Sequence, residues 1–239
     1  MTTITGNMPV ENRPQIPRIK GILFDLDGVL IDSEPLHEFT LLELSDRFGR
    51  RFGQDEILQF KGLPELSVAH AILKSFPDLA LTIDEIIRFR LELLKSNFHR
   101  VEMIEGALAF VQRVKAAGFR LGLTTSAARS MQQLACETFA LSPYFDTIIT
   151  GEDIERGKPD PQPYERTAAN LALRPDECMV VEDAVNGVKS GKAAGCFVVG
   201  ITTSFTAQAL RLVGSDLVVP SFAALEVYFF EGGARLRAG

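Results

Sequence analysis

The chain has 239 residues, of which 46% are hydrophobic and 23% are charged, and its formal net charge is −6 at neutral pH. This size and composition suit one large domain, or one domain with an insertion, and the negative balance argues against a nucleic-acid-binding surface. Three cysteines without a C-x-x-C spacing predict neither a disulfide framework nor a structural zinc site. No apolar stretch approaches the ~20 residues of a membrane span, so we expect a cytoplasmic protein with no membrane partner.

The first 17 residues are polar and include three prolines. They lack the apolar central region of a signal peptide. We therefore expect residues 1–17 to form a disordered N-terminal extension.

Apolar runs of strand length alternate with amphipathic helical segments along most of the remaining chain. This alternation predicts an α/β fold with a doubly wound parallel sheet, a Rossmann-like core. The expected strands are Ile19–Phe24, Arg120–Thr125, Thr147–Ile149, Met179–Val181, Phe197–Ile201 and Asp216–Val219. The expected helices are Ala107–Ala117, Ser130–Phe139, Pro163–Leu173, Asn186–Ala194 and Ala207–Leu212. Gly118 and Gly195 stand where glycines that end helices belong.

Between residues 35 and 103 the strand patterns stop and only helical patterns remain. The expected helices there are Leu36–Phe48, Asp55–Phe60, Ser67–Phe76 and Ile83–Asn97. Thr82 and Glu85 have the spacing of a capping box ahead of the last one. We interpret residues 35–103 as a small all-helical cap domain, inserted into a core domain made of residues 18–34 and 104–239.

Two carboxylates follow the first expected strand, in the sequence Asp25-Leu26-Asp27-Gly28. In extended backbone residues i and i+2 point the same way, so both side chains can reach one pocket. Neighbouring carboxylates repel each other unless a cation or a proton lies between them. The pattern is typical of Mg²⁺ binding and of chemistry with a nucleophilic aspartate.

Three further polar clusters follow other expected strands. Thr125 and Ser126 end one strand, Lys158 lies in a loop, and Glu182-Asp183 follow another strand. In a parallel sheet the carboxyl ends of the strands share one edge, where α/β proteins bind their ligands. The carboxylates, hydroxyls and lysine therefore predict a combined anion and metal site at that edge.

Four segments together resemble the motifs of the haloacid dehalogenase superfamily, in the branch of phosphatases and phosphomutases with a helical cap after the first motif. These segments are Phe24-Asp25-Leu26-Asp27-Gly28-Val29-Leu30-Ile31-Asp32-Ser33, Thr125, Gly157-Lys158-Pro159-Asp160, and Val181-Glu182-Asp183-Ala184-Val185-Asn186-Gly187. They occur in the order and spacing of that superfamily, over roughly residues 19–225.

The resemblance implies a role for each acidic residue. Asp25 would be the nucleophile that forms an aspartyl-phosphate, and Asp27 the general acid and then the general base. Mg²⁺ would be held by Asp25, by Asp27, in part through its backbone carbonyl, and by Asp183. Glu182 would contribute to the metal site directly or through water, and the sequence leaves both alternatives open.

The resemblance also assigns the phosphate contacts. Thr125 and the amide of Ser126 would bind the phosphoryl oxygens, and Lys158 would offset the charge of the nucleophile and of the phosphate. In the cap, the loop Phe60-Lys61-Gly62-Leu63-Pro64-Glu65 could enter the site. Lys61 and Gly62 are therefore candidate substrate contacts.

We expect a Mg²⁺-dependent phosphatase that acts on a small phosphorylated metabolite, with a sugar phosphate as the preferred class. The alternative is a phosphomutase of the β-phosphoglucomutase type, which Val29, Asp32, Ser33, His37 and the pair Lys61-Gly62 all resemble. A binding protein on the same fold is the remote alternative. It would need a lost catalytic residue, and all four motifs are intact.

Glu65 argues for the phosphatase. Such mutases resemble one another in having an arginine there for the second phosphate of their substrate, which a carboxylate would repel. The candidate cations that could replace this arginine are Arg88, Arg90, Lys95 and Arg129. The sequence alone does not choose among them.

Overall fold

The computed structural model describes residues 19–61, 63 and 65–231. Its centre is a six-stranded parallel sheet in the order β5-β4-β1-β6-β7-β8. The strands are β1 (Gly21–Phe24), β4 (Arg120–Thr124), β5 (Thr147–Ile149), β6 (Cys178–Glu182), β7 (Phe197–Ile201) and β8 (Leu217–Val219). The chain starts at the middle strand and builds outward on both sides. The carboxyl end of β1 therefore lies at a topological switch point, where such sheets bind ligands.

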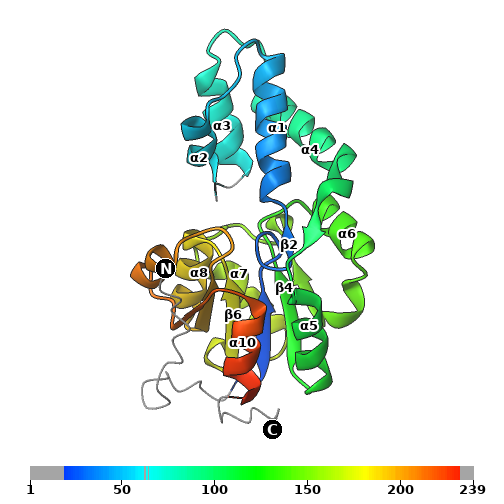
Figure 1. Ribbon diagram of the computed structural model, residues 1–239, viewed down its shortest axis with the longest axis vertical. Helices are drawn as coiled ribbons and strands as arrows, with labels where there is room; N and C mark the ends of the chain where they lie inside the picture. The colour runs from blue at the N-terminus through cyan, green and yellow to red at the C-terminus, as the bar shows by residue number, and fades with distance from the viewer. Residues whose placement is uncertain (1–18, 62, 64, 232–239) are drawn as a thin grey trace, which may run out of the picture.

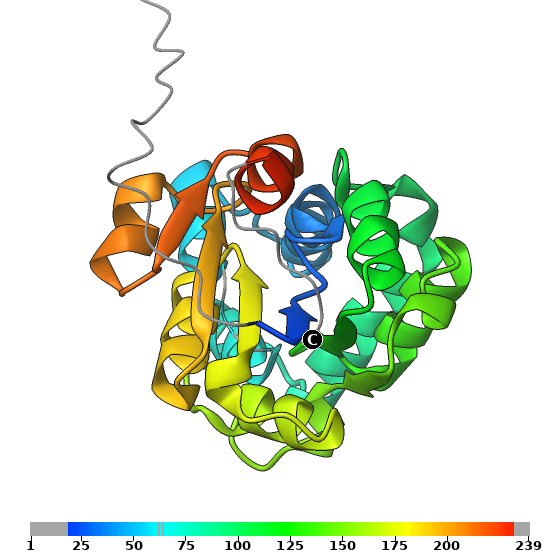
Figure 2. The same cartoon turned by 90° about the horizontal axis from the view of Figure 1, so that it is seen from below.

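Helices cover both faces of this sheet (Figure 2). One core includes residues of α5 (Ala107–Ala116), α6 (Arg129–Thr138) and α10 (Phe222–Glu226). The other includes residues of α7 (Gln162–Asn170), α8 (Val185–Ala194) and α9 (Ala207–Leu212). The central strands are buried on both faces, as sheets covered on both sides require.

A separate group of helices stands beyond the carboxyl ends of the strands, at the top of Figure 1. It comprises α1 (Glu34–Arg47), α2 (Gln54–Phe60), α3 (Glu65–Ser75) and α4 (Ile83–Ser96). These helices pack around a hydrophobic core of their own, in which Phe52 lies against Phe60 and Phe76. The inserted helical cap that the sequence predicts is thereby confirmed, whereas its exact boundaries stay a prediction.

The two chain crossings between core and cap are paired with each other. β2 (Ile31–Asp32) and β3 (Glu102–Met103) form a two-stranded antiparallel sheet. The sequence does not predict these strands, because two residues are too few to show a period of two. It also does not predict α10 and the short π-helix η6 (Val227–Glu231) that follows it.

The predicted strands and helices otherwise appear in the predicted order, and the doubly wound α/β fold is confirmed. Thr82 and Glu85 form the expected capping box, with the Thr82 hydroxyl accepting from the Glu85 amide. Gly118 and Gly195 have the left-handed backbone expected after a helix, with φ of 91° and 88°. The predicted disordered extension, residues 1–17, lies outside the described residues. Among the helices described, none has the length and apolar character that crossing a membrane would require.

Candidate active site

The strand register brings the predicted site residues to one level of the sheet. Phe24 of β1 pairs with Leu123 of β4 on one side and with Val181 of β6 on the other. The next residue on each strand therefore emerges at the same edge. For β1 and β6 these next residues are Asp25 and Glu182, and the Asp25 amide donates to the carbonyl of Val181 over 3.1 Å.

Lys158 reaches this edge from the loop before α7 and contacts two carboxylates at once. Its Nζ lies 2.6 Å from Asp25 Oδ1, 2.6 Å from Glu182 Oε1 and 3.1 Å from the carbonyl oxygen of Thr124. All of its side chain but 8% is buried. Burial alone would lower the pKa of Lys158, but Asp25 and Glu182 outweigh it and hold the pKa above its usual value. Lys158 is therefore a permanent cation at this site.

Both carboxylate oxygens of Glu182 are already occupied by protein donors. Oε1 accepts from Lys158 and from the phenol of Tyr164 at 2.7 Å. Oε2 accepts from the backbone amides of Asp183 and Ala184, at 3.1 and 3.2 Å. Glu182 is 1% exposed. These four hydrogen bonds account for most of the acceptor capacity of a carboxylate.

The carboxylates of Asp25, Glu182 and Asp183 form a compact acidic cluster, with one oxygen from each within 4.8 Å of the others. Burial raises the pKa of Asp25 from its ordinary value of 3.8 to about 7, and Lys158 only partly offsets this rise. Burial, together with Glu182 and Asp25, also raises the pKa of Asp183 well above its ordinary value. With one lysine for three carboxylates, the cluster suits a hard divalent cation with oxygen ligands, and Mg²⁺ fits this donor set.

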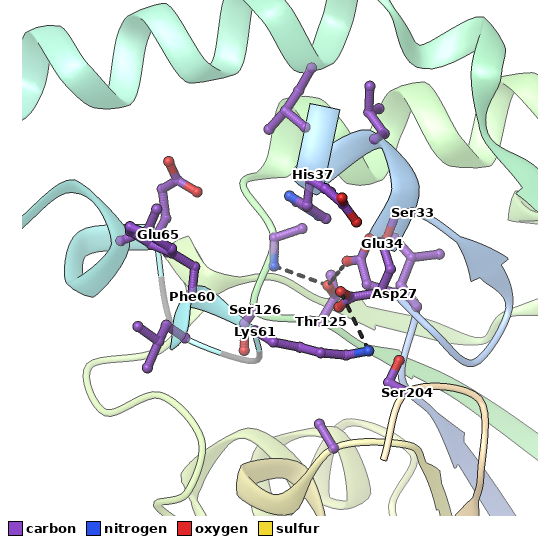
Figure 3. A pocket seen from close by; sticks show the side chains of 18 of the residues that line it. Asp27, Ser33, Glu34, His37, Phe60, Lys61, Glu65, Thr125, Ser126 and Ser204 are labelled. Carbon is purple, nitrogen blue, oxygen red and sulfur yellow. Dashed lines mark hydrogen bonds and ion pairs between the residues drawn. The ribbon is translucent and has the colours of Figure 1, made fainter. Parts of the chain in front are cut away.

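Asp27 lies beside this cluster, and its side chain is held by two hydroxyl groups. Ser33 Oγ donates to Oδ1 over 2.6 Å, and Thr125 Oγ1 lies 3.4 Å from Oδ2. Ser33 lies just before α1 and Thr125 just after β4, and both are near Asp27 in Figure 3. Gly28 makes the turn that follows, with φ of +74°, and a Cβ there would lie 1.9 Å from Asp183 Oδ2. Only glycine fits this position.

A cavity of about 460 Å³ opens between the core residues and the cap. Its core side includes Asp25, Asp27, Thr125 and Ser126, and its cap side includes Lys61. The Nζ atom of Lys61 lies 3.8 Å from Glu34 Oε2. The predicted substrate contact Gly62 lies outside the described residues.

Glu65 faces this cavity across from Asp27 and Ser33 (Figure 3), and its carboxylate is paired. Arg90 of α4 donates from Nε to Glu65 Oε1 over 2.7 Å and from Nη2 to Oε2 over 3.2 Å.

Among the candidate cations, Arg88 and Lys95 are exposed. Arg129 pairs with Asp153 at 2.6 Å. Arg90 alone of these four lines the cavity.

His37 lines the cavity and interacts electrostatically with Asp27 and with the Glu65–Arg90 pair. Its Nδ1 is 3.5 Å from Arg90 Nη2. Burial, with a smaller contribution from Arg90, lowers the pKa of His37, against the attraction of Asp27. His37 is therefore neutral near pH 7 and presents a lone pair to the guanidinium.

Sequence reasoning missed Tyr164 and the pairing of Glu65 with Arg90. Tyr164 is a fully buried residue of α7. A tyrosine on the apolar face of a helix needs a partner for its hydroxyl, and that need was the available signal. The Glu65–Arg90 contact joins two residues of α3 and α4 that lie 25 positions apart in the sequence, and no local pattern indicates it.

The family follows from the match to its sequence model. The model described as "Haloacid dehalogenase-like hydrolase" matches residues 22–201. The chain belongs to this family of hydrolases. The superfamily that the four motifs resemble is therefore confirmed.

Two curated relatives of this hydrolase are phosphatases by name. Hexitol phosphatase A of Escherichia coli is 35% identical over 214 residues, which cover 88% of this chain and 94% of that protein. Validoxylamine A 7'-phosphate phosphatase of Streptomyces hygroscopicus subsp. limoneus is 31% identical over 192 residues. The match covers 80% of this chain and 89% of that protein. The solved β-phosphoglucomutase of Clostridium difficile superposes with a TM-score of 0.77 at 21% identity, over 89% of this chain and 96% of that one. That similarity shows the fold alone.

We predict that Gly187→Ala destabilises the protein. Alanine normally stabilises a helix relative to glycine by up to about 1 kcal/mol. A Cβ on Gly187 would instead lie 1.7 Å from Glu182 Oε1 and push this carboxylate away from Lys158. We expect a loss of about 1–3 kcal/mol, the usual cost of overpacking, in denaturant unfolding. Gly157→Ala is the control, because its Cβ would meet nothing within 4 Å. Equal stability of the two variants would contradict the close packing of Glu182.

We also predict that Mg²⁺ stabilises the protein more at about pH 8 than at about pH 5. Without metal, Asp25 stays protonated in the folded protein up to about pH 7 but ionises near pH 3.8 when unfolded. The folded state thus binds more protons between these values, and the contribution of Asp25 to stability falls as the pH rises through them. Because Mg²⁺ needs the ionised carboxylate, protons compete with it below about pH 7. Thermal unfolding with Mg²⁺ or with chelator measures the difference. A shift of equal size at both pH values, or one that survives in Asp183→Asn, would refute this assignment.

Proposed function

We propose that this chain is a Mg²⁺-dependent phosphatase of small phosphorylated metabolites, with sugar and sugar-alcohol phosphates as the preferred class. The hydrolase family and the phosphatase relatives confirm the prediction of a phosphoric monoester hydrolase. The finer proposal rests on Asp25, which contacts Lys158, shares an acidic cluster with Asp183, and lines the cavity between the core and the cap. We place the reaction in the cytoplasm.

Asp25 and Asp183, with the backbone carbonyl of Asp27, would hold the metal ion. Glu182 would act mainly through Lys158, because its oxygens already accept four hydrogen bonds. When bound, Mg²⁺ would neutralise negative charge on the phosphoryl oxygens and on the nucleophile. The raised pKa of Asp25 supports this role, because the ionised nucleophile needs a nearby cation beyond Lys158.

In the first step, an Asp25 oxygen forms a bond to phosphorus while the bond from phosphorus to the leaving oxygen breaks. Asp27 gives its proton to that leaving oxygen, so the alcohol departs neutral. Ser33 and Thr125, which contact the Asp27 carboxyl group, would orient it toward the leaving oxygen. Lys158, Thr125 and Ser126 would bind the phosphoryl oxygens as charge develops on them.

In the second step, water attacks the phosphorus of the aspartyl-phosphate and gives a proton to Asp27. The bond from Asp25 to phosphorus breaks, which releases inorganic phosphate and restores both carboxyl groups to their starting state. The cap over the cavity would exclude bulk water and admit only fitting alcohols.

A phosphomutase is the second candidate. Two residues that match the pattern of β-phosphoglucomutases support it. Ser33 lies beside Asp27, and His37 lies beside Arg90. The phosphomutase is opposed by the cap, because Arg90 is the one of the four candidate cations that lines the cavity, and it is paired with Glu65.

We predict that Asp25→Asn abolishes turnover and that Asp27→Asn lowers it by about 10²–10⁴-fold. The first amide cannot attack phosphorus, and the second cannot exchange protons. Phosphate release from a sugar phosphate measures both effects, with circular dichroism to confirm folding. Asp78→Asn, on the exposed surface, is the control. Rapid turnover by Asp25→Asn would refute the mechanism, and mass spectrometry of a slow-substrate complex should find the phosphoryl group on Asp25.

We further predict that β-glucose 1-phosphate, with a trace of the 1,6-bisphosphate, yields inorganic phosphate and little glucose 6-phosphate. The Glu65–Arg90 pair leaves no net positive charge for the second phosphate of the bisphosphate intermediate. Coupled assays of phosphate and of glucose 6-phosphate distinguish the two outcomes. Efficient conversion to glucose 6-phosphate would establish the mutase instead.

A further inference from the structure

Arg90 is a buried charged residue of the cavity wall. The residue is 2% exposed, and its guanidinium makes two hydrogen bonds to Glu65 and faces His37. The third guanidinium nitrogen, Nη1, is buried and has no hydrogen-bond partner among the residues that the structure describes. A buried donor without a partner costs free energy, so such donors usually meet a ligand or an ordered water.

We infer that the Glu65–Arg90 pair is the substrate-selecting group of the cap, and that it binds a neutral hydroxyl group of the leaving alcohol. This inference rests on the proposed phosphatase function. Arg90 Nη1 would donate to the hydroxyl oxygen, and the hydroxyl hydrogen would be donated to the Glu65 carboxylate. Glu65 is only partly covered, with 38% of its side chain exposed, and it lines the same cavity.

The charge of the pair decides which group it binds. A second phosphate would meet one positive and one negative side chain, so attraction by Arg90 would be offset by repulsion from Glu65. A hydroxyl group is both donor and acceptor and satisfies the two side chains together. A site built for a hydroxyl rejects an analogue without it, because the buried polar groups then lose their partner.

The Glu65–Arg90 pair and the catalytic residues line one cavity, so one substrate could contact both. His37 is within electrostatic range of Asp27 on one side and of Arg90 and Glu65 on the other. The cavity is continuous from Asp25 to Glu65. Three apolar residues of α4 line the same cavity, and these are Ile87, Leu91 and Leu94. No other described side chain hydrogen-bonds to this guanidinium.

The test compares two esters of equal carbon number, glucitol 6-phosphate and n-hexyl phosphate, with Mg²⁺ present. The wild-type enzyme should prefer the polyol ester. Arg90→Met should reduce the ratio of the two kcat/KM values by about 10-fold or more, mainly through KM, while hexyl phosphate changes by less than about 3-fold. Arg90→Lys keeps the charge but loses the planar fork, so it should shift the ratio the same way even if Arg90→Met folds poorly. Arg88→Met, on the exposed side of α4, is the matched control and should leave the ratio unchanged.

Glu65→Gln tests the charge argument separately. It leaves Arg90 unopposed, so glucitol 1,6-bisphosphate should inhibit hexyl phosphate hydrolysis about 10-fold more strongly than in the wild type. Equal losses for both esters in both Arg90 variants would show that Arg90 only supports the cap and would overturn the inference. The inference would also be overturned if the ratio of the two kcat/KM values were the same in the Arg90 variants as in the wild-type enzyme. Failure of the wild-type enzyme to hydrolyse either ester would instead refute the proposed function.

Discussion

The contact of Lys158 with both Asp25 and Glu182 is the interaction on which the rest of this site depends. It places one cation between carboxylates on two adjacent strands, and it does so in a buried setting where unpaired charge is costly. The surrounding structure is arranged to support this contact. Tyr164 and two backbone amides satisfy Glu182, so that carboxylate is a fixed counter-charge. Gly187 leaves the space that the Glu182 carboxylate occupies.

The same arrangement divides the acidic residues by their surroundings. Glu182 accepts four hydrogen bonds within the protein. Burial raises the pKa values of Asp25 and Asp183, and Lys158 only partly offsets this rise. Asp27 differs again, since neutral hydroxyl groups hold it. In the proposed mechanism these four carboxylates would have three different tasks. Glu182 would anchor the lysine, Asp25 and Asp183 would hold a cation, with Asp25 also attacking phosphorus, and Asp27 would exchange protons.

The sequence predicts the parallel sheet and the edge at which the site lies, because buried strands and strand-end polar residues are local patterns. Asp25, Lys158 and Asp183 meet where parallel topology requires them to meet. Contacts between distant helices are not local patterns. The sequence suggested repulsion at Glu65, but the structure pairs that carboxylate with Arg90, one of four cations that the sequence could not rank. Similarly, the sequence could not decide whether Glu182 would bind a metal ion directly or through water, because that depends on the contacts of its side chain with Lys158 and Tyr164.

The pairing of β2 with β3 has a mechanical consequence. Two separate connections would let the cap twist about either one, but a hydrogen-bonded ribbon makes both connections bend together about one axis. Ser33 follows β2 directly and donates to Asp27. Bending at the ribbon would therefore change the distance between this hydroxyl and the carboxyl group. In the proposed mechanism, closure of the cap over a substrate would then also align Asp27 for proton transfer, as parts of one movement.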